Sequence, residues 1–484
     1  MEGPDYKISD LENWAKRVEE ITASFGLDWY PQEFEIIDYE TMIGLQAYHG
    51  LPSYYPHWSF GKAYERNATF YRYGFVNLPY ELVINTSPCV AYLMDQNPLA
   101  LQILTIAHVY AHNNFFKNNV NFQKGTRAEL SPEFFHASAE RIRGYVADST
   151  IGRLKVEKVL DAAHALMYHC SRIPGIQYAT QKEKREEIFR KMNIREDEWE
   201  HLKTKKEIEI PDLTNIPLEP EENILLFIRD NSPKGLEDWE KDTLTIVAES
   251  FDYFKPQILT KIANEGWASY WHHRIIRALN LPADLRLAIS DYHSGVICAP
   301  KNPLMISPYW VGFTMWTDIF RKYEEPTPEE KSHNDLVGGG GLDHILHVMR
   351  TTNDQAFLRA YLIKEVMEKL NFFSFVPDGQ KLIVDKKVED ETWKKIKALV
   401  MRDVGLGLVP DVRIKDADYE NARSAYLIHN FDGRHLEKEY VQKTIEHFHY
   451  LWGRPVYLET ATFKRQAPYI YNFDGKNHSG HRRK

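Results

Sequence analysis

The sequence predicts a mostly helical α+β protein, and three observations indicate this class. Apolar residues recur with helical spacing through most of the first 375 residues. Short β-like runs occur in two places, before residue 90 and after residue 379. The chain has 484 residues, and this length exceeds what one hydrophobic core usually holds. Hydrophobic residues make up 43% of the chain. We therefore expect a large helical part and a small C-terminal α+β domain.

The N-terminal part combines helices with extended segments. A first helix is predicted to begin near Ser9 and to end before Gly26, because serine favours helix starts and glycine helix ends. Extended segments are predicted at 33–38 and 80–86. The further helices of this part are expected at 99–117, 134–150 and 154–168.

Composition along the chain predicts four parts. Residues 1–180 would form a zincin-like part, in which a strand precedes a helix that carries two histidines. The segment 181–222 is rich in Lys and Glu, ends in prolines, and reads as a charged excursion and linker. A helical block at 223–375 would pack on the first part. Residues 376–484 would form the α+β domain, with strands at 381–384, 411–414, 424–428 and 456–460 and a helix at 437–452.

Charge and hydropathy exclude several classes of protein. The net charge is −9 and no dense basic stripe occurs, so nucleic-acid binding is not expected. The sequence contains no run of about 18 apolar residues, so no membrane span is predicted. The three cysteines are far apart, so they predict neither a disulfide framework nor a thiolate metal cluster. With no signal-peptide pattern at the start, we expect a cytoplasmic protein.

The strongest chemical signal is the pair His108 and His112 in the helix predicted at 99–117. Side chains four positions apart lie on one face of a helix, so both imidazoles can reach one ion. Zinc hydrolases with a His-Glu-x-x-His helix use this spacing, and the glutamate acts as general base. Here Val109 occupies that position. Two ordinary core histidines would give the same pattern.

A zinc site also needs a third protein ligand, and two acidic residues qualify. Glu157 lies on a predicted helix one turn before Asp161, a spacing that suits a ligand plus a carboxylate that orients a ligand histidine. Glu265 shares a helix face with His272, and an acid beside two tryptophans needs a partner. The sequence does not decide between these glutamates, and Glu157 and Asp161 alone would usually face solvent.

The catalytic roles follow as hypotheses from these faces and spacings. The glutamate that does not bind zinc would activate the water, which places Glu265 as the candidate base when Glu157 is the ligand. His272 or Tyr309 would donate a hydrogen bond to a developing oxyanion. The metal ligands expected in this arrangement are His108, His112 and Glu157, with Asp161 behind them.

Several motifs together resemble the stage V sporulation protein R (SpoVR) family. They extend over about residues 10–320, and the C-terminal part resembles the tail domain of the family. The matching motifs are His57-Trp-Ser-Phe-Gly-Lys62, Tyr80-Glu-Leu-Val-Ile-Asn85, Ala107-His-Val-Tyr-Ala-His112, Phe115-Phe-Lys-Asn-Asn119, Ala139-Glu-Arg141, Val156-Glu-Lys-Val-Leu-Asp161 and Asn264-Glu-Gly-Trp-Ala-Ser-Tyr-Trp-His272.

The resemblance implies a role in forming the spore cortex, a peptidoglycan layer, or in the stress response of bacteria without spores. The candidate zinc site and this resemblance together leave two expected functions. The first is a zinc-dependent hydrolase of amide or peptide bonds, acting on a peptidoglycan precursor or a protein. The second is a non-catalytic scaffold or regulator, whose histidine helix is structural. Bound metal would separate them, while the sequence leaves the substrate, protein partners and oligomeric state open.

Overall fold

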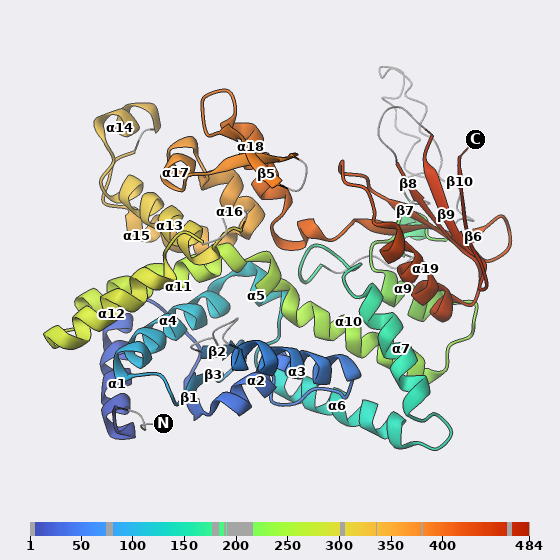
Figure 1. The fold of residues 1–484 in the computed structure, drawn as a ribbon, viewed down its shortest axis with the longest axis horizontal. Helices are drawn as coiled ribbons and strands as arrows, with labels where there is room; N and C mark the ends of the chain where they lie inside the picture. The colour runs from blue at the N-terminus through green and yellow to red at the C-terminus, as the bar shows by residue number, and fades with distance from the viewer. Residues whose placement is uncertain are drawn as a thin grey trace. The chain divides into compact units, whose positions relative to one another are not determined.

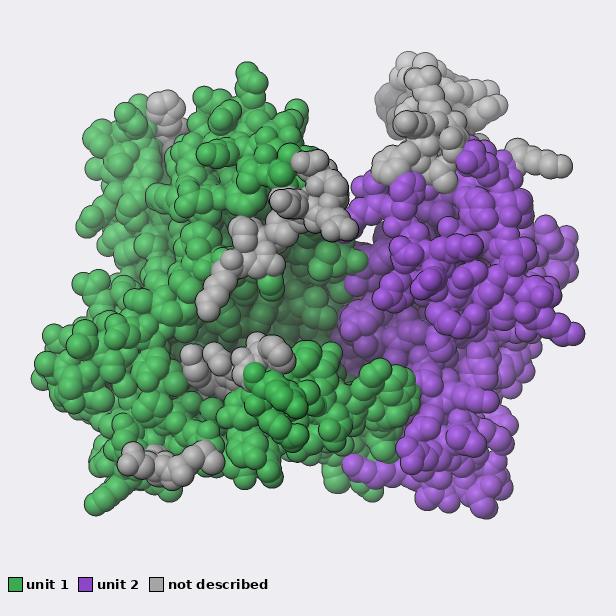
Figure 2. Space-filling model, in the orientation of Figure 1, with its two compact units in different colours: residues 1–140, 252–408 green, residues 141–251, 409–484 purple. Residues whose placement is uncertain are grey.

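The computed structural model describes residues 5–73, 81–176, 183–187, 190, 216–300, 305–334, 336–378, 381–461 and 467–483. Most of the charged excursion expected at 181–222 lies outside these residues. The chain forms two compact units, which are coloured separately in Figure 2. Unit 1 consists of residues 1–140 and 252–408, and unit 2 of residues 141–251 and 409–484.

Unit 1 contains a three-stranded sheet in the order β1-β3-β2. The two predicted extended segments are confirmed as β1 (Gln32–Ile37) and β2 (Glu81–Ile84). A third strand, β3 (Cys89–Met94), lies between them, parallel to β1 and antiparallel to β2. It was not predicted, because its short apolar run shows no regular alternation of polar and apolar residues. β3 leads into the histidine helix.

The histidine helix, α4 (Leu99–Asn118), forms the centre of unit 1 and is buried from Ala100 to Phe116. A helix that is apolar on all sides must be enclosed by other elements. Helices α1 (Ile8–Ser24) and α11 (Lys261–Ala278) pack against it, and α13 (Pro308–Glu324) packs against α11 (Figure 1). The fully buried tryptophans of this core are Trp267, Trp271 and Trp316.

The other elements of unit 1 are mostly short helices around this core. Two long helices cross the boundary between the units, α6 (Ser131–Ala147) and α10 (Asp238–Leu259). The remaining elements are α2 (Tyr39–Ala47), α3 (Trp58–Arg72), α5 (Val120–Gly125), α12 (Ala283–Val296), α14 (Pro328–Asn334), α15 (Gly341–Thr351), α16 (Asp354–Tyr361), α17 (Lys364–Lys369), β4 (Phe373–Asp378), β5 (Lys381–Lys387), α18 (Trp393–Arg402) and the 3-10 helix Gly405–Leu408.

Unit 2 is built on a five-stranded sheet in the order β10-β9-β8-β7-β6. β7 and β8 are parallel, joined by the crossover helix α19 (Lys438–Trp452), and the other pairs are antiparallel. Helix α7 packs on α19. The elements are α7 (Arg153–Leu166), α9 (Ile224–Asn231), β6 (Val412–Tyr419), β7 (Ser424–His429), β8 (Val456–Thr460), β9 (Tyr469–Phe473) and β10 (His478–Arg482).

The mostly helical α+β class with a small C-terminal sheet is therefore confirmed. The zincin-like core stays a prediction. The strand expected before the histidine helix was 80–86, which is β2, whereas the strand that directly precedes α4 is β3. No helix of the described residues is long and apolar enough to cross a lipid bilayer.

Asp354 fixes the start of α11. Its carboxylate accepts hydrogen bonds from the backbone N–H groups of Ile262 and Ala263, at 2.9 and 2.8 Å. Only 1% of Asp354 is exposed. The first N–H groups of a helix have no partner within the helix, so this carboxylate satisfies two donors that would otherwise be buried without one.

We expect Asp354→Ala to lower the free energy of unfolding by about 2 kcal/mol, because two buried donors lose their acceptor. Burial raises the pKa of Asp354 to about 7, although the N–H groups of Ile262 and Ala263 oppose the rise. A carboxyl with a raised folded pKa stabilises the fold at low pH and loses this effect as the pH rises through about 7. The loss on substitution should therefore be larger at pH 5.5 than at pH 8.5. Chemical denaturation at both values measures it, and an equal loss would contradict this account.

Candidate metal centre

His108 and His112 point their Nε2 atoms at one carboxylate oxygen. Glu265 on α11 places its Oε2 atom 3.6 Å from Nε2 of His108 and 3.4 Å from Nε2 of His112. The three side chains are 5%, 6% and 7% exposed. The structure thus brings together the two histidines and one of the two glutamates that the sequence offered.

These distances decide what holds the three groups together. A hydrogen bond between nitrogen and oxygen is about 2.7–3.2 Å long, so 3.4 and 3.6 Å are too long for good ones. Two ligands bound at about 2.0–2.1 Å to a tetrahedral zinc ion lie roughly 3.3–3.4 Å apart. The spacing of Glu265 Oε2 and the two imidazoles therefore fits ligands of a shared cation better than direct partners.

The other oxygen of Glu265 supports this interpretation. Oε1 accepts a hydrogen bond from Nζ of Lys261 at 2.5 Å, whereas the buried Oε2 has no hydrogen-bond partner. Burial alone would raise the pKa of Glu265, but Lys261, His108 and His112 lower it well below its usual value. The residue is therefore a carboxylate, and its unpartnered oxygen faces the two imidazoles. A buried carboxylate oxygen needs a partner, and a cation between it and the imidazoles would supply one.

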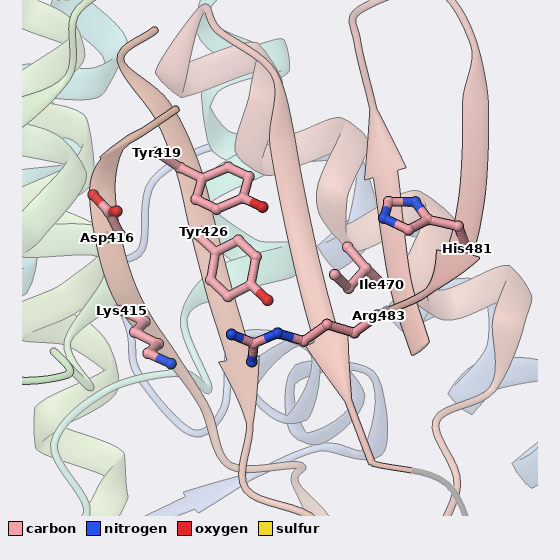
Figure 3. A pocket seen from close by; sticks show the side chains of 7 residues that line it. All are labelled: Lys415, Asp416, Tyr419, Tyr426, Ile470, His481 and Arg483. Atoms are coloured by element: carbon pink, nitrogen blue, oxygen red, sulfur yellow. The ribbon is translucent and has the colours of Figure 1, made fainter. Parts of the chain in front are cut away.

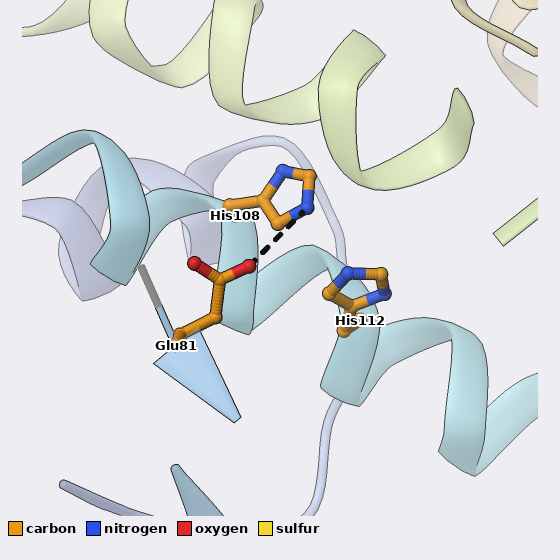
Figure 4. A group of neighbouring side chains, drawn as sticks. All are labelled: Glu81, His108 and His112. Atoms are coloured by element: carbon orange, nitrogen blue, oxygen red, sulfur yellow. Dashed lines mark ion pairs between the residues drawn. The ribbon is translucent and has the colours of Figure 1, made fainter. Parts of the chain in front are cut away.

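A second acid, Glu81, reaches the same place from β2. Its Oε1 lies 3.9 Å from Nε2 of His108, and Glu81, His108 and His112 each offer a ligand atom within 4.8 Å of the others. Figure 4 shows this carboxylate turned toward both imidazoles. Burial raises the pKa of Glu81, although the two histidines oppose the rise.

Sequence reasoning missed Glu81. The signal was present, since Glu81 is an acid that opens the apolar run Leu82-Val-Ile84 in a strand beside the histidine helix. What the sequence could not supply is the pairing of β2 with β3, which positions this carboxylate near α4.

The second nitrogen of each imidazole, Nδ1, also lies at hydrogen-bond distance from a side chain of α11. Nδ1 of His112 lies 2.9 Å from Oδ1 of Asn264, the residue before Glu265. Nδ1 of His108 lies 2.8 Å from Nδ1 of His272, whose Nε2 lies 2.7 Å from Nδ1 of His293 on α12. These are hydrogen-bond lengths, so each pair shares a proton and not a metal.

A cation bound at both Nε2 atoms would place the protons of His108 and His112 on their Nδ1 atoms. Nδ1–H of His112 would then donate to Asn264 Oδ1, and Nδ1–H of His108 would donate to Nδ1 of His272, whose Nε2–H would donate to His293. His272 must be neutral to do both, and burial, with His108 and His293 nearby, lowers its pKa well below the usual value. Metal-binding histidines are typically oriented through their second nitrogen in this way.

We expect His272→Leu to weaken metal binding roughly 10- to 100-fold, because His108 loses the acceptor that fixes its tautomer. The adjacent His273→Leu is the matched control. His273 stacks on His293 at 4.8 Å between ring centroids, and no hydrogen bond to His108 is recorded for it among the described residues. Competitive titration with a metal chelator measures both affinities. Equal affinities in the two variants would contradict the orienting role.

Tyr309, on the first turn of α13, covers one side of the centre. Its ring stacks on His108 with centroids 6.2 Å apart and an interplanar angle of 28°. The charge of Glu265, followed by burial and Glu81, raises the pKa of Tyr309 far above its usual value. The phenol is therefore a neutral hydrogen-bond donor beside the carboxylates. His272, in contrast, contacts Nδ1 of His108, the ring nitrogen that does not face Glu265.

Glu157 and Asp161 belong to unit 2 and not to unit 1, which contains the centre. Both lie on α7, and Oε1 of Glu157 accepts a hydrogen bond from Nε of Arg153 at 2.8 Å. That contact is an ordinary i,i+4 ion pair on a helix. Neither residue is part of the group of Glu81, His108 and His112, whose ligand atoms lie within 4.8 Å of one another.

The geometry defines a helical α+β protein with a buried candidate metal centre of two histidines and two carboxylates. Family comparison agrees with the sequence motifs. The family model described as SpoVR like protein matches residues 5–409, and the SpoVR-like C-terminal domain matches residues 410–462. The chain therefore belongs to the SpoVR family.

A curated relative matches this chain over most of the length of both proteins. The Uncharacterized protein YcgB of Escherichia coli (strain K12) is 32% identical over 480 residues, which cover 95% of this chain and 93% of the relative. No solved structure matches the chain. Both comparisons thus show family membership.

Proposed function

We propose that this protein binds one zinc ion through His108, His112 and Glu265 and hydrolyses an amide or peptide bond. The observation that carries the proposal is the buried, unpartnered Oε2 of Glu265, 3.4–3.6 Å from two imidazole nitrogens. Two neutral nitrogens and one carboxylate oxygen are a ligand set that zinc prefers, and three protein ligands leave a position for water.

Glu81 is the proposed general base in place of the glutamate missing at Val109. Val109 is fully buried and apolar, so the residue after His108 cannot take that role. Glu81 lies beside His108, and its raised pKa brings it nearer to the range in which a carboxylate accepts a proton at neutral pH. Zinc would supply a water of lowered pKa and a Lewis acid at this position.

Tyr309 and Lys261 are the proposed electrostatic partners of the reaction. Tyr309 can donate its phenolic hydrogen to an oxygen that becomes negative during attack on a carbonyl group. Lys261 holds the other oxygen of Glu265, which keeps that carboxylate ionised and aimed at the imidazoles. The zincin-like arrangement of a strand followed by a His-x-x-x-His helix fits this proposal, with β3 as the strand.

The family resemblance is the only indication of the substrate class. A peptidoglycan precursor, or a protein that regulates cell-wall or stress physiology, contains the amide bonds that such a centre would cleave. The rival proposal is a non-catalytic scaffold or regulator with a structural metal or none. The two proposals differ in the role of Glu81. The hydrolase needs Glu81 as the base beside three ligands, whereas Glu81 as a fourth ligand would give the closed site of a structural zinc.

Metal analysis of the purified protein, followed by a hydrolysis assay on muropeptides and casein, tests the proposal. We expect about one zinc ion per chain and cleavage that chelation abolishes and added zinc restores. Absence of bound zinc after purification with added zinc would contradict the metal centre. Bound zinc with no cleavage of either substrate class would favour the scaffold.

A further inference from the structure

A pocket of about 430 Å³ lies on the sheet of unit 2, which contains none of the metal-centre residues. It is seen in Figure 3. Helix α19 packs against β8 and β9, and its His449 contacts Phe473 of β9. Side chains alternate between the two faces of a strand, so Ile470 and Phe473 of β9 point to opposite faces of the sheet. The pocket therefore lies on the face that α19 does not cover. The lining residues are Lys415, Asp416, Tyr419, Tyr426, Ile470, His481 and Arg483.

Irregularities in β6 place several pocket residues on this face. The register with β7 shifts between Ile414 and Asp416 and again between Asp416 and Tyr419. A β-bulge re-aims side chains that regular alternation would send to opposite faces. As a result the neighbouring residues Lys415 and Asp416 both line the pocket.

Two cationic groups converge at one end of the pocket. In Figure 3 the ammonium of Lys415 and the guanidinium of Arg483 point toward each other below Tyr426, whereas the carboxylate of Asp416 points away from them. Arg483 is held from one side by Glu459, at 3.1 Å, and Glu459 also accepts a hydrogen bond from the hydroxyl of Tyr426. No ion pair is recorded for Lys415 among the described residues.

The buried Glu459 therefore builds the site. It is 7% exposed, and it fixes the Tyr426 hydroxyl and one nitrogen of Arg483 while leaving other guanidinium donors directed into the pocket. Glu459 balances the charge of Arg483. Asp416, the acid of the lining, accepts the backbone N–H of Asp418 and is turned away from the two cations in Figure 3, so the ammonium of Lys415 remains for a ligand. An acceptor with several oxygens and a negative charge suits these donors, and a phosphate group is such an acceptor.

The other walls are aromatic and apolar. The rings of Tyr419 and Tyr426 lie 4.5 Å apart, Tyr419 also contacts Tyr457 at 5.0 Å, and Ile470 is buried at the floor. A partly exposed tyrosine beside an apolar floor can pack against a flat ring. The cavity volume lies in the range of small-molecule sites.

From this arrangement we propose that the pocket binds a nucleoside monophosphate, with its phosphate between Lys415 and Arg483 and its base against Tyr419. The proposal is independent of zinc binding and of hydrolysis, because every residue it uses lies in unit 2. His481 on β10 closes the far side and would contact the sugar or base.

Isothermal titration calorimetry of the full chain with AMP, GMP, CMP and UMP tests the proposal, with adenosine and inorganic phosphate as separate probes. We expect at least one nucleotide to bind at least ten times more tightly than either separate probe. Lys415→Met, which keeps the apolar stem, should weaken that binding roughly ten- to a hundred-fold. Tyr419→Leu should lower the affinity for the nucleotide and leave the affinity for inorganic phosphate unchanged.

Lys438→Met is the matched control, because Lys438 is an exposed lysine of α19 outside the pocket. It should bind the nucleotide like the unchanged protein. Circular dichroism confirms that each variant is folded. The proposal is overturned if no nucleotide binds at millimolar concentration, if phosphate alone binds as tightly as the nucleotide, or if folded Lys415→Met binds like the control.

Discussion

Replacing Glu265 by glutamine should abolish stoichiometric zinc binding. Glutamine has nearly the same shape as glutamate but no charge, so the Oε2 position between the two imidazoles loses its ligand character. We expect the affinity for zinc to fall by at least about 100-fold, more than for removal of an orienting residue. Zinc content after dialysis, and competition with a chromogenic chelator, measure the change.

Glu157→Gln provides the control for this experiment. Glu157 is also a helical glutamate, and its carboxylate is paired with Arg153 in unit 2. We expect this variant to keep its zinc. The opposite result, with zinc lost in Glu157→Gln and kept in Glu265→Gln, would transfer the ligand role to Glu157 and refute the centre proposed here.

Adding a methyl group at Gly312 should disrupt the contact that positions the centre. Helices α11 and α13 touch through Gly266 and Gly312, and a Cβ on Gly312 would lie 2.3 Å from the carbonyl oxygen of Ile262 and 2.5 Å from Cα of Gly266. Both are backbone atoms, so the helices must separate. We expect Gly312→Ala to cost roughly 3 kcal/mol in the free energy of unfolding.

The same separation should lower zinc affinity. Glu265 directly precedes Gly266, and Tyr309 lies three residues before Gly312, so both move when the helices part. The midpoint of thermal unfolding and a chelator titration measure the two effects. Gly295→Ala on α12 is the control, since nothing lies within 4 Å of a Cβ there, and alanine should be neutral or stabilising in that helix. Equal melting temperatures for the two variants would contradict the tight crossing.

Part of the centre was predictable because helical spacing is a local property. The spacing of His108 and His112 placed both imidazoles on one face, and Glu265 beside tryptophans indicated a buried acid in need of a partner. Choosing Glu265 over Glu157 required knowing that α11 packs on α4. Glu81 required the pairing of β2 with β3. These are contacts between residues far apart in the chain, and one sequence does not contain them.

The fold shows the same difference between local patterns, which one sequence contains, and contacts between distant residues, which it does not. Elements with a clear local pattern were predicted closely, such as α4, α19 and β8. The strands β9 and β10 were not predicted. In the structure β10 pairs with β9, because backbone hydrogen bonds to a neighbouring strand can order residues whose side chains show no β pattern.

Crystallography of the zinc-loaded protein at the zinc absorption edge tests the central claim most directly. The account predicts one strong anomalous peak within about 2.0–2.2 Å of Nε2 of His108, Nε2 of His112 and Oε2 of Glu265. A peak bound by other residues, or direct hydrogen bonds closing the gap between Glu265 and the imidazoles with no peak there, would contradict it.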